Sequence, residues 1–118
     1  MDDDDAKAYD APFPSNESMA GARQFPSLVP IIPDNPAIPA NREAWKVLEN
    51  WVKPFLTAFS DSDPVTAGAH VRFQESVPGA KNQHHTTIEG VGHFLQEQAP
   101  TALSAAVIEF VKNNPLPA

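Results

Sequence analysis

The sequence predicts an α/β fold in which short parallel strands are covered by helices on both faces. Two short runs bounded by polar residues, 54–59 and 85–89, are the candidate buried strands. Patterns of helical period lie before, between and after them, at residues 42–52, 65–76 and 100–112. Strands that alternate with amphipathic helices form parallel sheets. Because two strands make a poor sheet by themselves, we expect this pair to be the edge of something larger.

The helices after residue 41 are indicated by their apolar faces. Asn41 is a suitable N-cap for the helix over 42–52, whereas Gly68 weakens the helix predicted over 65–76. The apolar face of the first helix contains Ala44, Trp45, Leu48, Trp51 and Val52. The last helix has apolar residues at i, i+3, i+4, i+7 and i+8, namely Leu103, Ala106, Val107, Phe110 and Val111.

The first forty residues have a different texture, because the prolines of the chain cluster between residues 12 and 39. Residues 15–18 can cap a short helix over 19–25, which ends near Pro26. Residues 30–39 then form an extended, proline-rich connection. We therefore divide the chain into two regions, 1–40 and 41–118.

Charge and composition exclude several classes of function. The formal net charge is −7, and it is concentrated near the acidic N-terminus. No basic patch exists, so nucleic acid and anionic membranes are poor partners. The chain has no cysteine, which excludes disulfides and thiolate chemistry. No apolar run is long enough to span a bilayer and the N-terminus is unlike a signal peptide, so we expect a cytoplasmic protein.

The histidine and aspartate runs do not predict a metal site. His84 and His85 are neighbours in a strand, where adjacent side chains point to opposite faces and cannot easily share a metal. Residues 2–5 lack the ligand spacing and the turn glycine of a calcium loop, so we interpret them as a solvated end. His70 is interpreted as a solvated helix residue. We expect neither a metal nor an organic cofactor.

Two residues that could carry chemistry follow the two predicted strands. Asp63 comes after the first strand and His93 after the second, 30 residues later. Since ligands gather at the carboxyl ends of parallel strands, we expect both side chains at the same edge of the sheet. A carboxylate beside an imidazole is the orienting half of a hydrolytic triad. The alternative is that Asp63 is a turn residue and His93 is structural.

Several stretches resemble haloalkane dehalogenases of the α/β-hydrolase superfamily. Residues 90–97 (GVGHFLQE) resemble the histidine loop, which is closest to that of haloalkane dehalogenases and epoxide hydrolases. Residues 60–65 (SDSDPV) resemble the loop that bears the acid. Residues 9–14 (YDAPFP) and 20–26 (AGARQFP) resemble the end of the helical cap, and the likeness continues through residues 39–45.

The resemblance implies that the chain is the C-terminal part of an α/β-hydrolase fold. Residues 1–40 would be the end of the helical cap and a connection, and residues 41–118 the last two parallel strands with their flanking helices. Asp63 would be the catalytic acid and His93 the catalytic histidine.

The resemblance also points to a substrate pocket. Phe13 and Pro14 match cap positions that line the pocket in similar enzymes, with a rigid proline turn as the alternative reading. Val65 lies two residues after Asp63, and Phe94 directly follows His93, so both could form walls of the site. The equally supported alternative is that they are ordinary core residues.

The implied activity is hydrolytic dehalogenation through an alkyl-enzyme ester. The nucleophilic aspartate, the oxyanion hole and the halide-binding tryptophan of similar enzymes cannot be placed in this sequence. Trp45 and Trp51 lie on an apolar helix face and are interpreted as core residues. We therefore expect a segment that is inactive alone and acts on a small halogenated or epoxide substrate only with an N-terminal half. Its exposed sheet edge should permit self-association.

Two other functions remain open. An epoxide hydrolase uses the same acid and base, and the residue that binds oxygen or halide lies outside this sequence. Tyr9, the only tyrosine, is weak evidence against epoxide chemistry. The chain could also be a non-catalytic remnant that serves as an interaction module.

Overall fold

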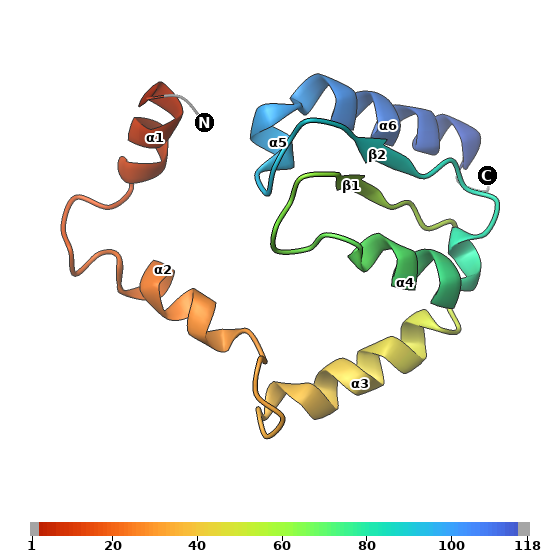
Figure 1. Ribbon diagram of the computed structural model, residues 1–118, viewed down its shortest axis with the longest axis horizontal. Coiled ribbons are helices and arrows are strands. Elements are labelled where there is room, and N and C mark those ends of the chain that lie inside the picture. Colours follow the sequence, from red (N-terminus) through yellow and green to blue (C-terminus); the bar gives the residue numbers. More distant parts are fainter. Residues whose placement is uncertain (1–2, 116–118) are drawn as a thin grey trace. The chain divides into compact units, whose positions relative to one another are not determined.

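The computed structural model describes residues 3–115, which form a helix-rich chain with two short strands (Figure 1). The elements are α1 (Asp3–Asp10), α2 (Ala20–Gln24), the 3-10 helix η1 (Phe25–Leu28), α3 (Ala37–Leu48), β1 (Ala58–Ser60), α4 (Ala69–Ser76), the 3-10 helix η2 (Pro78–Ala80), β2 (Thr86–Ile88), α5 (Leu95–Gln98) and α6 (Pro100–Asn113). The chain divides into two compact units, residues 1–44 and 45–118, which are described separately. The assignment of residues 1–40 and 41–118 to a cap and a core stays a prediction.

The first unit contains a helix that the sequence did not indicate. Residues of the acidic run, interpreted as a solvated end, begin α1, where negative charge is favourable at a helix N-terminus. Lys7 donates a hydrogen bond to the carboxylate of Asp4 one turn earlier, at 2.8 Å. The predicted cap of α2 is wrong: Ser15 and Ser18 bond to each other in a turn, and Met19 occupies the N-cap.

Helix α3 begins four residues before the predicted cap at Asn41. The side chain of Asn35 accepts a hydrogen bond from the backbone N–H of Ala37 at 2.9 Å and starts the helix there. Pro39 fits in the first turn because its missing N–H would have no partner within the helix. The connection from residue 30 to residue 39 is therefore shorter than expected, and α3 ends at Leu48, so Trp51 lies beyond it.

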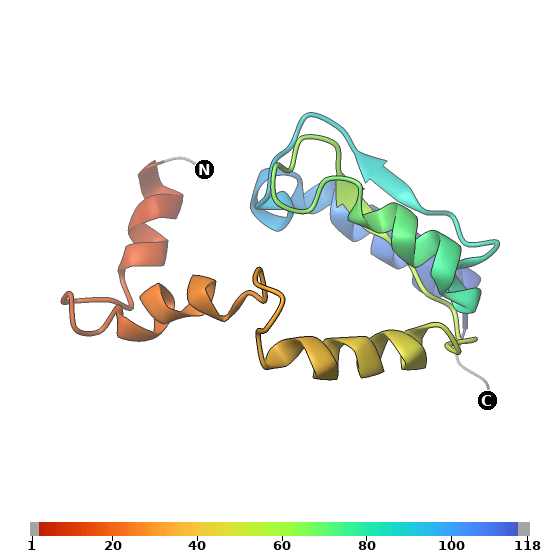
Figure 2. The ribbon, with the colours of Figure 1, turned by 60° about the horizontal axis from the view of Figure 1, so that its bottom comes forward.

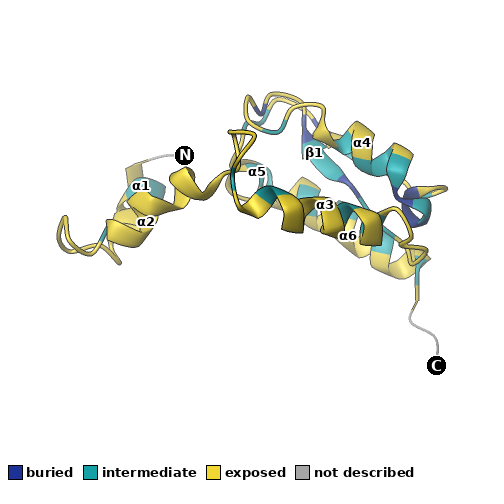
Figure 3. Cartoon of the chain, turned by 90° about the horizontal axis from the view of Figure 1, so that it is seen from below, coloured by how far each residue is buried: buried dark blue, intermediate teal, exposed yellow. Residues whose placement is uncertain are grey.

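In the second unit the two strands pair in parallel, as predicted. Ala58 lies opposite Thr86 and Ser60 opposite Ile88. Helices α4 and α6 lie on opposite sides of the strand pair (Figures 1 and 3). Figure 2 shows the same arrangement from a second direction, with α4 in front of α6. The sequence had indicated this covering on both faces.

Both strands are shorter than the runs that predicted them. In the first run, the residues before β1 have other hydrogen-bond partners. The N–H of Phe55 donates to the carbonyl of Gly79 at 3.0 Å, and the N–H of Thr57 donates to Nδ1 of His85 at 3.1 Å. Gly79 itself donates to the carbonyl of Trp51 at 2.7 Å. A Cβ at Gly79 would lie 1.8 Å from the carbonyl oxygen of Lys53, so only glycine permits this approach.

The predicted helix over 65–76 begins later than expected, at Ala69. Residues 64–68 form a turn, and Gly68 takes a positive φ of 79° at the N-cap of α4. Such a backbone conformation favours glycine. The first residues of this turn are held by the side chain of Asp63, as described below, and this contact keeps them out of the helix.

The core among the described residues is small (Figure 3). Its buried apolar residues are Val77, Ala80 and Ile88, of which Val77 is fully buried. Trp45 is half-buried and stacks on Phe73, which supports its interpretation as a packing residue. Several large apolar side chains of α6 are exposed, namely Val107, Ile108 and Val111. None of the helices within residues 3–115 has the length and apolar character that crossing a membrane requires.

Candidate active site

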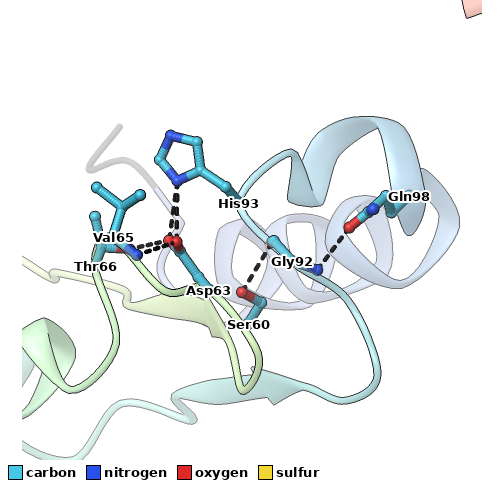
Figure 4. A network of polar contacts seen from close by, with 7 residues as sticks. All are labelled: Ser60, Asp63, Val65, Thr66, Gly92, His93 and Gln98. Carbon is cyan, nitrogen blue, oxygen red and sulfur yellow. Dashed lines mark hydrogen bonds and ion pairs between the residues drawn. The ribbon is translucent and has the colours of Figure 1, made fainter. Parts of the chain in front are cut away.

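Asp63 lies in the turn that follows β1, and its carboxylate is fixed by neighbours in the chain. The backbone N–H of Val65 donates to Oδ1 at 2.8 Å, and the hydroxyl of Thr66 donates to Oδ2 (Figure 4). Only 7% of the Asp63 side chain is exposed. A buried carboxylate with two donors has a single, well-defined orientation.

His93 lies in the loop that follows β2 and points at this carboxylate. Its Nδ1 is 3.1 Å from both Oδ1 and Oδ2 of Asp63. An ionised carboxylate only accepts hydrogen bonds, so Nδ1 carries the proton and donates. In neutral His93, Nε2 then has a free lone pair, and it points away from Asp63 (Figure 4). The His93 side chain is 47% exposed, so water can reach it.

The surroundings of Asp63 favour its charged form. The hydroxyl of Thr66 is the largest cause that holds the pKa of Asp63 well below its usual range. The bonds from the N–H of Val65 and from His93 act in the same direction, whereas burial acts against them. Asp63 therefore stays negative throughout the neutral range and can stabilise an imidazolium at His93.

The loops after the two strands are tied together by side chains that the sequence analysis missed. Asp61 accepts a hydrogen bond from the N–H of Gly90 at 2.9 Å. Ser60 donates to the carbonyl of Gly92 at 3.0 Å, and the side chain of Gln98 accepts from the N–H of Gly92 at 2.6 Å. The contacts of Asp61 and Ser60 join residues about 30 positions apart in the chain, whereas that of Gln98 lies within the segment after β2. The sequence signal for these three contacts is limited to polar side chains at the end of β1 and after the histidine loop.

A hollow of about 200 Å³ lies beside the Asp63–His93 pair. It is lined by Ala58, Phe59, Ser60, Asp63, Thr66, His93, Leu95 and Gln96. Val65 and Phe94 are exposed, and the ring of Phe94 meets the His93 ring edge to face at 5.4 Å between centroids. Phe13 and Pro14 lie in the first unit, where both are exposed. The pocket role of these four residues stays a prediction.

The other histidines have different surroundings. His85 accepts from the N–H of Thr57 and places Nε2 2.9 Å from the carbonyl of Ala80, so it bridges the residue before β1 and η2 as a structural residue. His84 is exposed, with Nδ1 3.6 Å from the carboxylate of Glu109. The solvated interpretation of His70 is wrong, because this residue is half-buried and its Nδ1 is shielded without a partner among the described residues.

The described residues contain no group of three or more histidine, cysteine or acidic side chains that could hold a metal ion. The Asp63–His93 pair contains two such residues only, and its geometry is that of a hydrogen-bonded acid and base. Chemically, the pair can take a proton from water and stabilise the resulting positive charge.

Known proteins that resemble this chain in sequence are named haloalkane dehalogenases. No protein-family profile matches the chain. It is 53% identical over 108 residues to a haloalkane dehalogenase of Psychrobacter cryohalolentis, a match that covers 92% of this chain and 36% of that protein. It is 46% identical over 102 residues to haloalkane dehalogenase 1 of Mycobacterium tuberculosis and to the haloalkane dehalogenase of Mycobacterium marinum. Each of these matches covers 86% of this chain and 34% of the relative.

The extent of these matches agrees with the resemblance of the histidine loop, the acid loop and the residues before them. The chain spans about a third of the length of the curated relatives that it matches. Over nearly its whole length, the chain is a homologue of a portion of haloalkane dehalogenases.

Proposed function

We propose that this chain provides the water-activating half of the active site of a haloalkane dehalogenase-type α/β-hydrolase. The single observation that carries the proposal is the contact between the Asp63 carboxylate and Nδ1 of His93, at 3.1 Å. The relatives favour dehalogenation over epoxide hydrolysis, because those reported above are named haloalkane dehalogenases. The parallel strand pair, with helices on both sides, supports the C-terminal part of an α/β-hydrolase sheet as its context.

The reaction begins with a carboxylate nucleophile that the N-terminal half of the enzyme would supply. It displaces halide from the substrate carbon and leaves an alkyl ester on the enzyme. Nε2 of His93 then takes a proton from water as the water oxygen adds to the ester carbonyl. The ester C–O bond breaks and the alcohol leaves with a proton, so the carboxylate is regenerated and one proton is released with the halide. Asp63 stabilises the imidazolium between these steps.

The proposal assigns two different steps to two parts of the enzyme. Halide displacement needs only the nucleophile and the groups that bind halide, whereas ester hydrolysis needs His93 and Asp63. A variant that lacks His93 should therefore release halide once and then stop. A non-catalytic interaction module would show no such separation.

A chimera tests this separation. The chain replaces the aligned third of the Psychrobacter relative, and halide and alcohol are measured separately in a single turnover of 1-bromobutane. We expect the parent chimera to release both products, and His93→Ala to release halide without alcohol. The matched control is His84→Ala, which changes an exposed histidine at the other end of β2 and should release both. Alcohol formed by His93→Ala at the parent rate would refute the proposal.

A further inference from the structure

The peptide groups on either side of Gly92 are held by two side chains from different elements (Figure 4). The hydroxyl of Ser60, the last residue of β1, donates to the Gly92 carbonyl at 3.0 Å. The amide oxygen of Gln98, the last residue of α5, accepts from the Gly92 N–H at 2.6 Å. The backbone directly before His93 is thus tied to the sheet through one bond and to a helix through the other.

These ties matter because the other bonds of the loop hold its ends: Asp61 bonds to Gly90, and the Phe94 carbonyl accepts from α5. Residues 91–94 form neither helix nor strand. Gly90 takes a positive φ of 74°, and glycine has the widest choice of backbone conformations. Gly92 itself has room for a Cβ, whose nearest neighbour would be the Gln98 oxygen at 3.5 Å. The orientation of this peptide is therefore set by its hydrogen bonds and not by crowding.

The Gly92 peptide is one residue from the imidazole, so its orientation decides where the ring lies. The bond from Nδ1 to Asp63 is shared between two oxygens at 3.1 Å, and a shared bond of this kind restricts the ring less than one short, linear bond. Rotation of the peptide would turn Nε2 away from a water beside the ester. A misplacement of about 1 Å can cost about a hundredfold in rate.

We propose that Ser60 and Gln98 are positioning residues, which hold the Gly92 peptide so that His93 stays on Asp63 with Nε2 aimed at the attacking water. The inference rests on the proposed function, because it acts through His93. It adds the prediction that these two side chains affect ester hydrolysis and leave halide displacement unchanged.

Gln98 gives the cleaner test, because its contact with Gly92 is exposed and its loss should cost the fold little. Gln98→Leu removes the acceptor at similar size, and Gln98→Glu restores an acceptor oxygen at the same position. The matched control is Gln83→Leu, which removes a side-chain acceptor of Asn114 before β2, away from the histidine loop. Ser60→Ala removes the donor on the other side of the Gly92 peptide, and Ser60→Thr keeps a hydroxyl.

The measurement is the rate of alcohol formation and the rate of halide release in single turnovers of the chimera. We expect Gln98→Leu to slow alcohol formation by about tenfold to a hundredfold with halide release unchanged. Gln98→Glu should recover most of the rate, and Gln83→Leu should match the parent. The inference is overturned if Gln98→Leu hydrolyses the ester at the parent rate, slows both steps equally, or is not rescued by Gln98→Glu.

The His93→Ala chimera separates this inference from the proposed function. If His93→Ala forms alcohol at the parent rate, the proposed function fails whatever the Gln98 variants do. If His93→Ala stops alcohol formation while Gln98→Leu does not slow it, only the positioning role of Gln98 is wrong.

Discussion

Asp63→Asn should impair ester hydrolysis by reversing the hydrogen bond at His93. In the parent, the N–H of Val65 donates to Oδ1 and the hydroxyl of Thr66 donates to Oδ2. An asparagine must keep its single oxygen toward Val65, because that backbone donor cannot turn. Its NH₂ group then occupies the Oδ2 position and donates to Nδ1 of His93, while the Thr66 hydroxyl rotates to accept. Nδ1 becomes the acceptor, and the proton moves to Nε2.

With the proton on Nε2, the imidazole cannot take a proton from water. In serine proteases the same substitution, which leaves the wrong tautomer, lowers the rate by about 10⁴-fold. We expect a loss of up to this size in alcohol formation by the Asp63→Asn chimera in single turnovers. Halide release should remain at the parent rate, because displacement by the nucleophile does not involve His93.

The control is Asp61→Asn, which makes the same chemical change two residues earlier. Asp61 accepts from the N–H of Gly90 through Oδ1, and an asparagine oxygen can replace it there. This variant should stay close to the parent in both steps. The reasoning about the tautomer is refuted if Asp63→Asn forms alcohol at the parent rate, or if it loses halide release to the same extent.

Three further predictions concern the acid, the fold and the chain itself. Thr66→Val should raise the pKa of Asp63 toward its usual value by removing the largest cause of its lowering. Because the pKa of Asp63 is lower in the folded than in the unfolded state, its ionisation stabilises the fold above the unfolded pKa of about 4, and this contribution is lost as pH falls. The difference between parent and variant in the free energy of unfolding, measured with urea, should therefore narrow from about pH 7 to about pH 3. Gly79→Ala should destabilise by about 1–3 kcal/mol or more, since its Cβ would lie 1.8 Å from the Lys53 carbonyl, whereas Gly21→Ala, with open space around it, should not destabilise. The 118-residue chain by itself should show no catalytic release of halide above a His93→Ala control, and it should associate in gel filtration through its strand edge.

The order of the elements in the second unit could be predicted from sequence, because it follows from the period of the apolar residues. The parallel pairing of β1 with β2 and the last helix are confirmed. The ends of elements were less predictable, because they depend on particular hydrogen bonds, some between residues far apart and some between near neighbours. The strand around Phe55 is short because its backbone bonds to Gly79, and α3 starts early because Asn35 caps it.

The candidate site shows the same division. The meeting of Asp63 and His93 follows from their places after two parallel strands, and the structure brings them together. The roles of Ser60 and Gln98 could not be predicted, because each bonds to a backbone group of a loop whose path only the folded chain sets. Thr66 was missed because it was expected inside a helix, whereas it lies in the turn over residues 64–68 and its hydroxyl bonds to Asp63.

The most direct test of the central claim is the mass of the His93→Ala chimera after it has reacted with 1-bromobutane and been quenched in acid. The account predicts a protein that carries one butyl group as an ester, located outside the 118 residues of this chain. Added imidazole should release the butyl group as butanol by replacing the missing base. A His93→Ala protein without the added mass that still forms butanol at the parent rate would contradict the account.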